Sequence, residues 1–143
     1  MITEKEMTNY FRGLLNNSNK VWFEEFEILG KRVDVVAIDL TEKHIIAMEL
    51  KIKDWKKGLK QCIANQLFSN EVYLAVWHEF AHRAPIKEFK EKGVGIMAVS
   101  ANTIEVLLEA RWKEIDSKKI MEIVKVNGRS VGDILVEREM HSL

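Results

Sequence analysis

Ionisable residues interrupt two apolar stretches of this chain that otherwise have the composition of buried β-strands. Residues 32–38 carry Asp34 among valine, alanine and isoleucine, and residues 45–52 carry Glu49 and Lys51 in a similar setting. A carboxylate or an ammonium group that is buried without a partner costs several kcal/mol or more. These three side chains therefore need partners or a metal ion, and they are the first candidates for a functional site.

The order of the expected elements indicates an α/β fold. Apolar spacing and a Thr3–Glu6 capping box predict a helix over residues 3–15. Segments of strand composition at 21–29, 32–39 and 44–52 are separated by short turns, which predicts an antiparallel meander. Beyond them the sequence predicts helices at 55–68, 85–92 and 117–124 and strands at 71–77, 96–99 and 103–108. We therefore expect a mixed central sheet flanked by helices.

Length and composition are those of a single globular domain. The 143 residues are 47% hydrophobic and 31% charged, enough to bury a core. We expect an α/β domain over residues 1–110 and a C-terminal extension over 111–143. Its apolar residues suggest that it packs on the same domain or forms a two-fold interface in a homodimer: Ile115, Ile120, Met121, Ile123 and Val124.

Charge and cysteine content narrow the classes of function. Lysine plus arginine and aspartate plus glutamate both number 22, so any attraction for nucleic acid must be local. One cysteine, Cys62, allows no intramolecular disulfide and too few ligands for a cysteine-based zinc site. The N-terminus lacks the apolar core of a signal peptide, and no apolar run approaches the ~18 residues of a membrane span. We expect a cytoplasmic protein with no membrane partner.

Strand periodicity predicts that the three ionisable residues converge. Glu49 and Lys51 point to one face because alternate side chains of a strand do so. Hairpin pairing can bring Asp34 within reach of Glu49. Two neighbouring carboxylates repel unless a proton or a cation lies between them, and oxygen ligands favour Mg²⁺ or Mn²⁺ over Zn²⁺. The spacing fits a metal site, and it also fits an ordinary ion pair on a half-exposed strand.

The chain resembles the PD-(D/E)XK nuclease superfamily. Asp34, followed by Glu49-Leu50-Lys51 on the next strand and flanked by a leading and a following helix, is similar to that superfamily's core of helix, three strands, helix and strand. Archaeal Holliday-junction resolvases and restriction-endonuclease-like proteins are most similar. The resemblance covers roughly the first hundred residues, and it implies a restriction-endonuclease-like core.

The same resemblance implies an enzyme that cleaves DNA. It assigns the metal-binding acids to Asp34 and Glu49, the catalytic lysine to Lys51, and Mg²⁺ as the cofactor, for which Mn²⁺ can substitute. Val33 stands where the superfamily's name has proline. A nuclease-fold protein that binds nucleic acid or assembles with partners without catalysis is the alternative.

Two further site residues follow from the resemblance. Members often carry an acid in the first helix, which Glu4-Lys5-Glu6 resembles; we favour Glu4 as a third metal ligand because Glu6 is used as a cap. First-turn acids that complement the helix dipole fit the pattern equally well. The superfamily's helical glutamine falls on Gln61 by position, although helical periodicity puts Gln66 on the apolar side of its helix.

Lysines gather beside the proposed site in an otherwise neutral chain. Positive charge near the acids favours contact with DNA phosphates, although a solvated helix face has the same pattern. The proposed nucleic-acid-binding residues are Lys53, Lys56, Lys57 and Lys60.

A histidine motif offers a third interpretation. His78-Glu79-Phe80-Ala81-His82 matches His-Glu-x-x-His, which on a helix binds zinc with the glutamate as a base. Here His78 directly follows an expected strand and Pro85 opens a helix only afterwards, so a zinc hydrolase is the weaker alternative.

Overall fold

A computed structural model describes residues 1–15, 20–28, 30–39, 42–123, 125–126, 129–130 and 133–134. Its elements follow one another as α1 (Glu4–Leu15), β1 (Lys20–Ile28), β2 (Lys31–Asp39), β3 (Ile45–Lys51), α2 (Trp55–Asn65), β4 (Glu71–Trp77), η1 (Ala81–Arg83), α3 (Ile86–Lys92), β5 (Gly95–Val99), β6 (Ile104–Leu108), α4 (Ser117–Ile123), β7 (Lys125–Val126) and β8 (Arg129–Ser130). The expected order of helix, three strands, helix and strand is confirmed.

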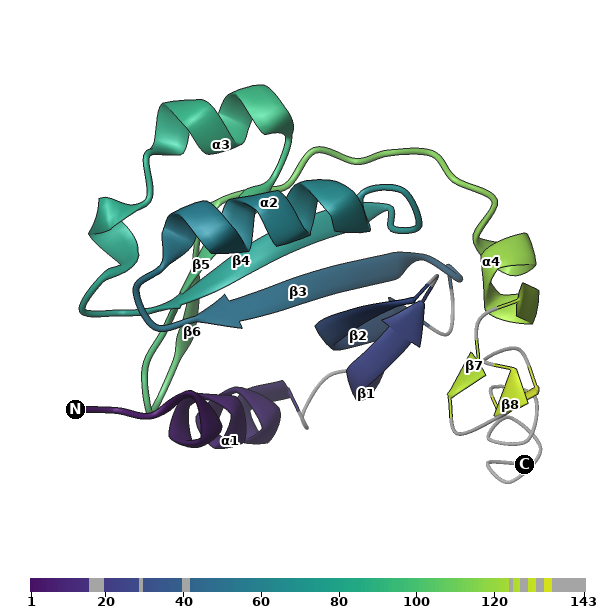
Figure 1. The fold of residues 1–143 in the computed structure, drawn as a ribbon, viewed down its shortest axis with the longest axis horizontal. Helices are drawn as coiled ribbons and strands as arrows, with labels where there is room; N and C mark the ends of the chain where they lie inside the picture. The colour runs from purple at the N-terminus through teal and green to yellow at the C-terminus, as the bar shows by residue number, and fades with distance from the viewer. Residues whose placement is uncertain are drawn as a thin grey trace.

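The central sheet has six strands in the order β1-β2-β3-β4-β5-β6 (Figure 1). The pairs β1/β2 and β2/β3 are antiparallel and form the predicted meander. The pairs β3/β4 and β4/β5 are parallel, and β6 returns antiparallel to β5. The chain therefore has an α/β fold with a mixed sheet, as its sequence predicts.

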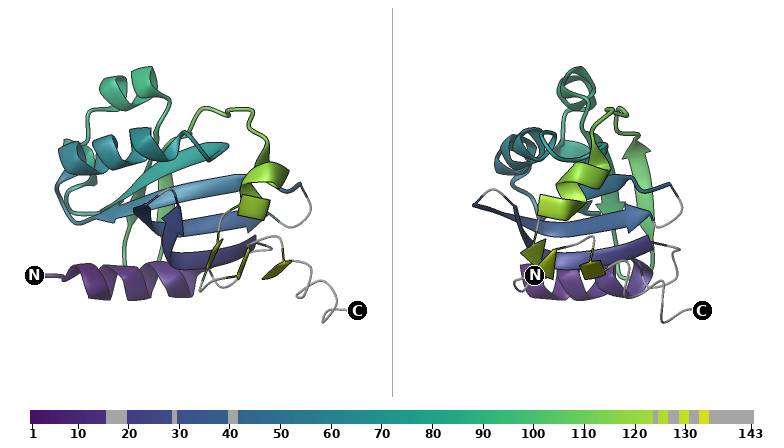
Figure 2. Two further views of the ribbon diagram at one scale, coloured as in Figure 1. Left: turned by 45° about the vertical axis from the view of Figure 1, so that its right-hand side comes forward. Right: turned by 90° about the vertical axis from the view of Figure 1, so that its right-hand side faces the viewer.

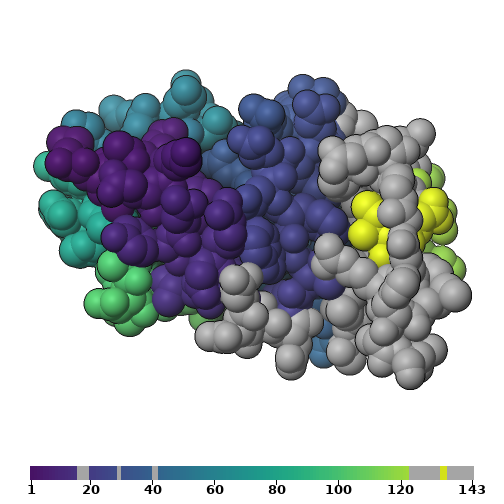
Figure 3. Space-filling view, turned by 90° about the horizontal axis from the view of Figure 1, so that it is seen from below, coloured from purple at the N-terminus to yellow at the C-terminus, as the bar shows by residue number. Residues whose placement is uncertain are grey.

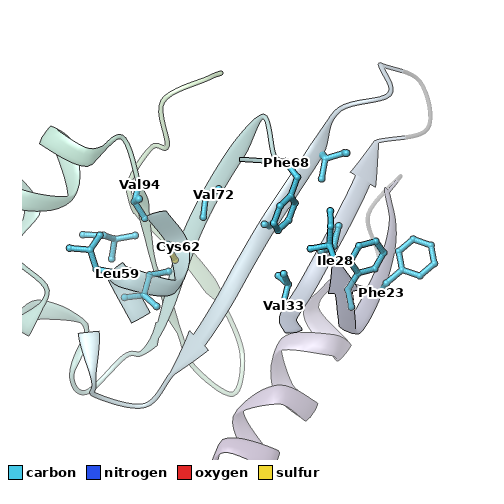
Figure 4. Packing of buried hydrophobic residues seen from close by; sticks show 14 of the residues in the cluster. Phe23, Ile28, Val33, Leu59, Cys62, Phe68, Val72 and Val94 are labelled. Carbon is cyan, nitrogen blue, oxygen red and sulfur yellow. The ribbon is translucent and has the colours of Figure 1, made fainter. Parts of the chain in front are cut away.

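Helices cover both faces of this sheet (Figures 1 and 2). Crossovers β3-α2-β4 and β4-α3-β5 progress in one direction across the sheet, which places both helices on the same face. Leu59 and Cys62 of α2 are buried in the core on that side (Figure 4). Phe89 of α3 belongs to the same core. On the other side, Met7 and Phe11 of α1 are buried against the sheet, and Figure 3 shows α1 in purple beside the blue hairpin β1–β2.

A capping box opens α1 as expected. The backbone N–H of Glu6 donates to Oγ1 of Thr3 at 3.1 Å, and the N–H of Thr3 donates to Oε1 of Glu6 at 3.2 Å. The Glu6 side chain is thereby held at the helix start.

The second helix is shorter than its sequence pattern predicts. Asp54 caps it by accepting from the N–H of Lys57 at 3.2 Å, but α2 ends at Asn65 rather than at residue 68. The next three N–H groups bond to carbonyls three residues back, which tightens the chain into turns. Leu67, which a helix continued to residue 68 would place on its apolar face, is therefore 68% exposed.

The alternation of side chains between the two faces of the sheet reverses halfway along the hairpin β1–β2. In β1 the residues buried in the α2-side core are Val21 and Phe23, then Phe26 and Ile28, so one extra residue intervenes. That residue is Glu25, whose φ of 50° lies in the left-handed region. In β2 the same core receives Val33, Val36 and Ile38. The hairpin thus bends where Glu25 and Asp34 lie opposite each other.

The described part of the C-terminal region packs on the α2-side core. Met121 of α4 is buried there, and Ile115 and Ile120 are partly buried against it. Asn70 holds the segment between β6 and α4 beside the sheet. Its carbonyl accepts from the N–H of Lys113 at 2.8 Å, and its side-chain amide donates to the carbonyl of Lys113 at 3.0 Å. The expected helix at 117–124 corresponds to α4, and Val124 lies outside the described residues.

Three short elements were not expected from the sequence. These are η1 after β4 and the two strands of the ribbon β7–β8. Among the described residues, no helix is long and apolar enough to cross a membrane.

Candidate active site

The site lies where β2 and β3 separate. Their pairing runs from Ile38↔Ile45 to Val35↔Met48 and stops there. One residue further, the Asp34 carboxylate replaces the backbone as the partner of β3, because its Oδ2 accepts from the N–H of Leu50 at 2.8 Å. The bend in the hairpin therefore turns the Asp34 side chain toward the end of β3.

Glu49 is a buried carboxyl group on that end of β3. Its side chain is only 1% exposed, and its Oε1 accepts from the side-chain amide of Asn65 in α2 at 2.9 Å. Burial, followed by the negative charge of Asp34, raises the pKa of Glu49 to about 8. A hydrogen bond between the two carboxyl groups also contributes to this rise. The structure thus brings the carboxyl groups of Asp34 and Glu49 into contact.

Lys51 lies on the same side of β3 as Glu49. Its positive charge opposes the rise of the Glu49 pKa, as expected of a neighbouring ammonium group. Gly58 lets α2 approach this point: a Cβ there would lie 3.0 Å from Cγ of Lys51 and 2.5 Å from Cδ1 of Leu74. The helix therefore packs directly on the aliphatic part of Lys51.

Two clefts flank the pair of acids. The α2-side cleft has a volume of about 360 Å³ and lies between the start of β2 and helix α2. Its polar lining consists of Lys31, Arg32, Glu49, Lys60, Gln61 and Asn65. The α1-side cleft, of about 410 Å³, lies between α1 and the hairpin. Its charged lining consists of Glu4, Lys5, Arg12, Glu24, Glu25 and Asp34.

Of the alternative residues proposed from the sequence, one acid of α1 and one glutamine of α2 line a cleft of the site, and the other acid and glutamine do not. Glu4 is exposed and lines the α1-side cleft together with Asp34, whereas Glu6 is held in the capping box. Gln61 lines the α2-side cleft, with a buried side-chain oxygen that has no hydrogen-bond partner among the described residues. Gln66 lies away from the site, because its amide donates to the carbonyl of Lys92 at 2.8 Å.

The lysines expected to bind nucleic acid are all exposed. They are Lys53, Lys56, Lys57 and Lys60. Lys60 alone among these four lines the α2-side cleft. The Lys56 ammonium instead lies over the ring of Trp55, 5.7 Å from its centroid.

Sequence reasoning missed Asn65, Lys31 and Arg32. Asn65 is 2% exposed and holds Glu49, and it lies seven residues after Gly58 and three after Cys62, both buried on α2. A polar residue at that spacing on a buried helical stripe is the signal that would have found it. Lys31 and Arg32 open β2 and reach the cleft from the opposite wall to α2.

The histidine motif does not have the geometry that a zinc hydrolase needs. His78 lies in the turn after β4, and His82 lies in η1, a 3₁₀ turn of three residues. The two therefore do not project from successive turns of one α-helix. Over the described part of the chain, no group of three His, Cys, Asp or Glu side chains is arranged to hold a metal ion.

The acid pair nevertheless has the donor chemistry of a magnesium site. Two carboxyl groups in contact keep a proton between them in the absence of a cation, and a divalent ion can take its place. Mg²⁺ often uses one or two protein carboxylates and completes its shell with water and phosphate oxygens. Asp34 and Glu49 would hold it, and Glu4 faces the cleft that adjoins Asp34.

Comparison with known proteins identifies a shared fold. No protein-family model and no curated protein matches the chain. The SPO1766 protein of unknown function from Silicibacter pomeroyi superposes with a TM-score of 0.69 at 16% identity, covering 99% of this chain and 92% of that one. A repair endonuclease from Pyrococcus abyssi superposes with a TM-score of 0.45 at 18% identity, covering 71% of this chain and 48% of the other. The first likeness shows the fold alone, and the second is too partial to carry an argument.

Proposed function

We propose that this chain is a magnesium-dependent deoxyribonuclease that hydrolyses phosphodiester bonds in DNA. The observation that carries the proposal is the contact between Asp34 and Glu49, whose pKa is raised to about 8. Burying two carboxyl groups in contact lowers the stability of the fold. Acids with perturbed pKa values in clefts are frequent at catalytic sites, where function explains why such a cost is kept. Lys51, whose charge acts on Glu49, adds a cation that can stabilise negative charge on a phosphate.

Each residue has a defined role in this proposal. Asp34 and Glu49 would hold Mg²⁺, which when bound would polarise the scissile phosphate and stabilise its developing charge. Asn65 fixes one oxygen of Glu49 by its hydrogen bond, and the other oxygen would be left to bind the ion. The Lys51 ammonium would orient the attacking water and stabilise negative charge on the phosphate in the transition state.

Hydrolysis then proceeds by displacement at phosphorus. The water oxygen forms a bond to phosphorus while the bond from phosphorus to one sugar oxygen breaks. The water gives up a proton to solvent, and the departing sugar oxygen takes one up. The products are one phosphate monoester end and one hydroxyl end.

A cleavage assay tests the proposal. The purified chain is incubated with duplex, branched and single-stranded DNA in Mg²⁺ or in EDTA, and Lys51→Ala is compared with Lys87→Ala, an exposed residue of α3. We expect cleavage in Mg²⁺ that EDTA abolishes, a loss of about 100-fold or more in Lys51→Ala, and no change in Lys87→Ala. Salt-sensitive DNA binding without turnover would instead identify a catalytically silent nucleic-acid-binding module.

A further inference from the structure

The two clefts beside the acid pair have opposite charge. In the α2-side cleft, three cationic side chains face one acid, Glu49. In the α1-side cleft, the cations Lys5 and Arg12 face four acids. A polyanion approaching the site therefore meets attraction from one side and repulsion from the other.

The cations of the α2-side cleft are also available to a ligand. Lys31 and Lys60 are exposed, and neither forms an ion pair with a described residue. Arg32 meets Glu25 at 3.5 Å, but their side chains are 63% and 71% exposed, so water screens the pair.

One of the two cations of the α1-side cleft is already paired with a carboxylate. In the α1-side cleft, Arg12 binds both carboxylate oxygens of Glu24, at 2.8 and 2.7 Å. A bidentate pair of this kind leaves little of the guanidinium for an anion. Unneutralised positive charge near the site is therefore concentrated on the α2 side.

We propose that the α2-side cleft binds a backbone phosphate of the DNA strand, adjacent to the phosphate that is cleaved. Lys31 from β2 and Lys60 from α2 hold it from opposite walls, and Arg32 adds positive charge at the rim. Gln61 and the amide of Asn65 line the same cleft without adding negative charge to it. This assignment of the ligand rests on the proposed nuclease function, and it gives the strand a direction of entry, from the α2 side toward the acids.

A DNA-binding measurement without catalysis tests the assignment. Fluorescence anisotropy with a fluorescein-labelled duplex in EDTA compares the wild type, the double variant Lys31→Ala/Lys60→Ala and the control Lys87→Ala/Lys90→Ala. The control removes the same charge from exposed positions of α3, which lies on the far side of α2 from β2 (Figure 1). We expect about 10-fold weaker binding in the first double variant at low salt, and a salt slope smaller by about 1 to 2. The control should bind within about twofold of the wild type.

The outcomes separate this inference from the proposed function. Equal binding by both double variants, or no DNA binding by the wild type at low salt, overturns the inference. If the wild type still cleaves DNA in Mg²⁺ in that case, the proposed function stands. Absence of cleavage together with weakened binding in Lys31→Ala/Lys60→Ala contradicts the function and supports the cleft. Competition by poly-glutamate as strong as competition by unlabelled DNA would assign the cleft to acidic proteins and overturn the inference.

Discussion

At the scale of single residues, the burial of Glu49 lowers the stability of the folded protein. Its carboxyl group is buried against α2 and in contact with the carboxyl group of Asp34, and the side-chain amide of Asn65 donates a hydrogen bond to it. In a purely structural core this position would favour an apolar residue. A bound cation between the two carboxyl groups would offset the free-energy cost of burying them.

The raised pKa of Glu49 predicts how stability depends on pH. The folded protein holds this proton up to about pH 8, whereas the unfolded chain releases it near the ordinary value of 4.5. Between these values the folded state binds more protons, so the free energy of unfolding in EDTA falls as pH rises and levels off above about pH 8. We expect the contribution to be of the order of a few kcal/mol.

Urea unfolding at pH 5 and at pH 8, in the wild type and in Glu49→Gln, measures this contribution. Every other titrating group is common to both proteins, so the difference between their pH dependences reports Glu49 together with its contact to Asp34. The wild type should lose more stability than the variant between the two pH values. An identical loss in both proteins would mean that Glu49 is already ionised in the folded state.

Some residues of the site could be predicted from the sequence, and others could not, because their positions depend on tertiary packing. Asp34, Glu49 and Lys51 were found because a charge in an apolar strand is visible in the sequence itself. The burial of Asn65 depends on the pitch and end of α2, and the reach of Lys31 depends on the bend in the hairpin. Both are consequences of tertiary packing, so the strand pattern alone did not indicate them.

At the scale of elements, the bend in β1–β2 positions the site. Regular alternation predicts one phase of burial along each strand, but at Glu25, whose φ is 50°, the alternation is broken and the buried side is reversed. The same change occurs in β2 at Asp34, which leaves that side chain to bond β3. Sequence alternation located the strands within one or two residues and could not reveal this reversal, because any residue can be forced into the left-handed region by its surroundings.

The close approach of α2 to β3 makes a testable prediction at Gly58. A methyl group there would overlap Leu74 and crowd Lys51. We expect Gly58→Ala to lower the free energy of unfolding, because overpacking of about 1–3 kcal/mol outweighs the ~1 kcal/mol gained in helix propensity. Because Lys51 is displaced, cleavage of DNA in Mg²⁺ should fall as well.

Gly13 of α1 supplies the matched control. A Cβ at Gly13 would have nothing within 4 Å, so Gly13→Ala gains helix propensity without a packing cost. Thermal and urea unfolding should place Gly13→Ala above the wild type and Gly58→Ala below it. Equal stabilisation by the two substitutions would show that α2 can move away from the sheet freely.

At the scale of the whole molecule, the site lies between two layers. The acids occupy the opening between β2 and β3, with α1 on one side and α2 on the other. The cleft beside α1 is mainly acidic and the cleft beside α2 is mainly basic. The two carboxyl groups lie between these clefts. No short segment could reproduce this arrangement, because its parts come from α1, the hairpin, β3 and α2.

Calorimetric titration of the metal-free protein with Mn²⁺ at pH 7 measures whether Asp34 and Glu49 bind one metal ion together. Glu49 is protonated at this pH, so binding should displace close to one proton per ion. Titration in two buffers of different ionisation enthalpy counts that proton. We expect saturable binding with proton release, and loss of both in Asp34→Asn. Absence of saturable binding, or binding that Asp34→Asn leaves unchanged, would contradict it.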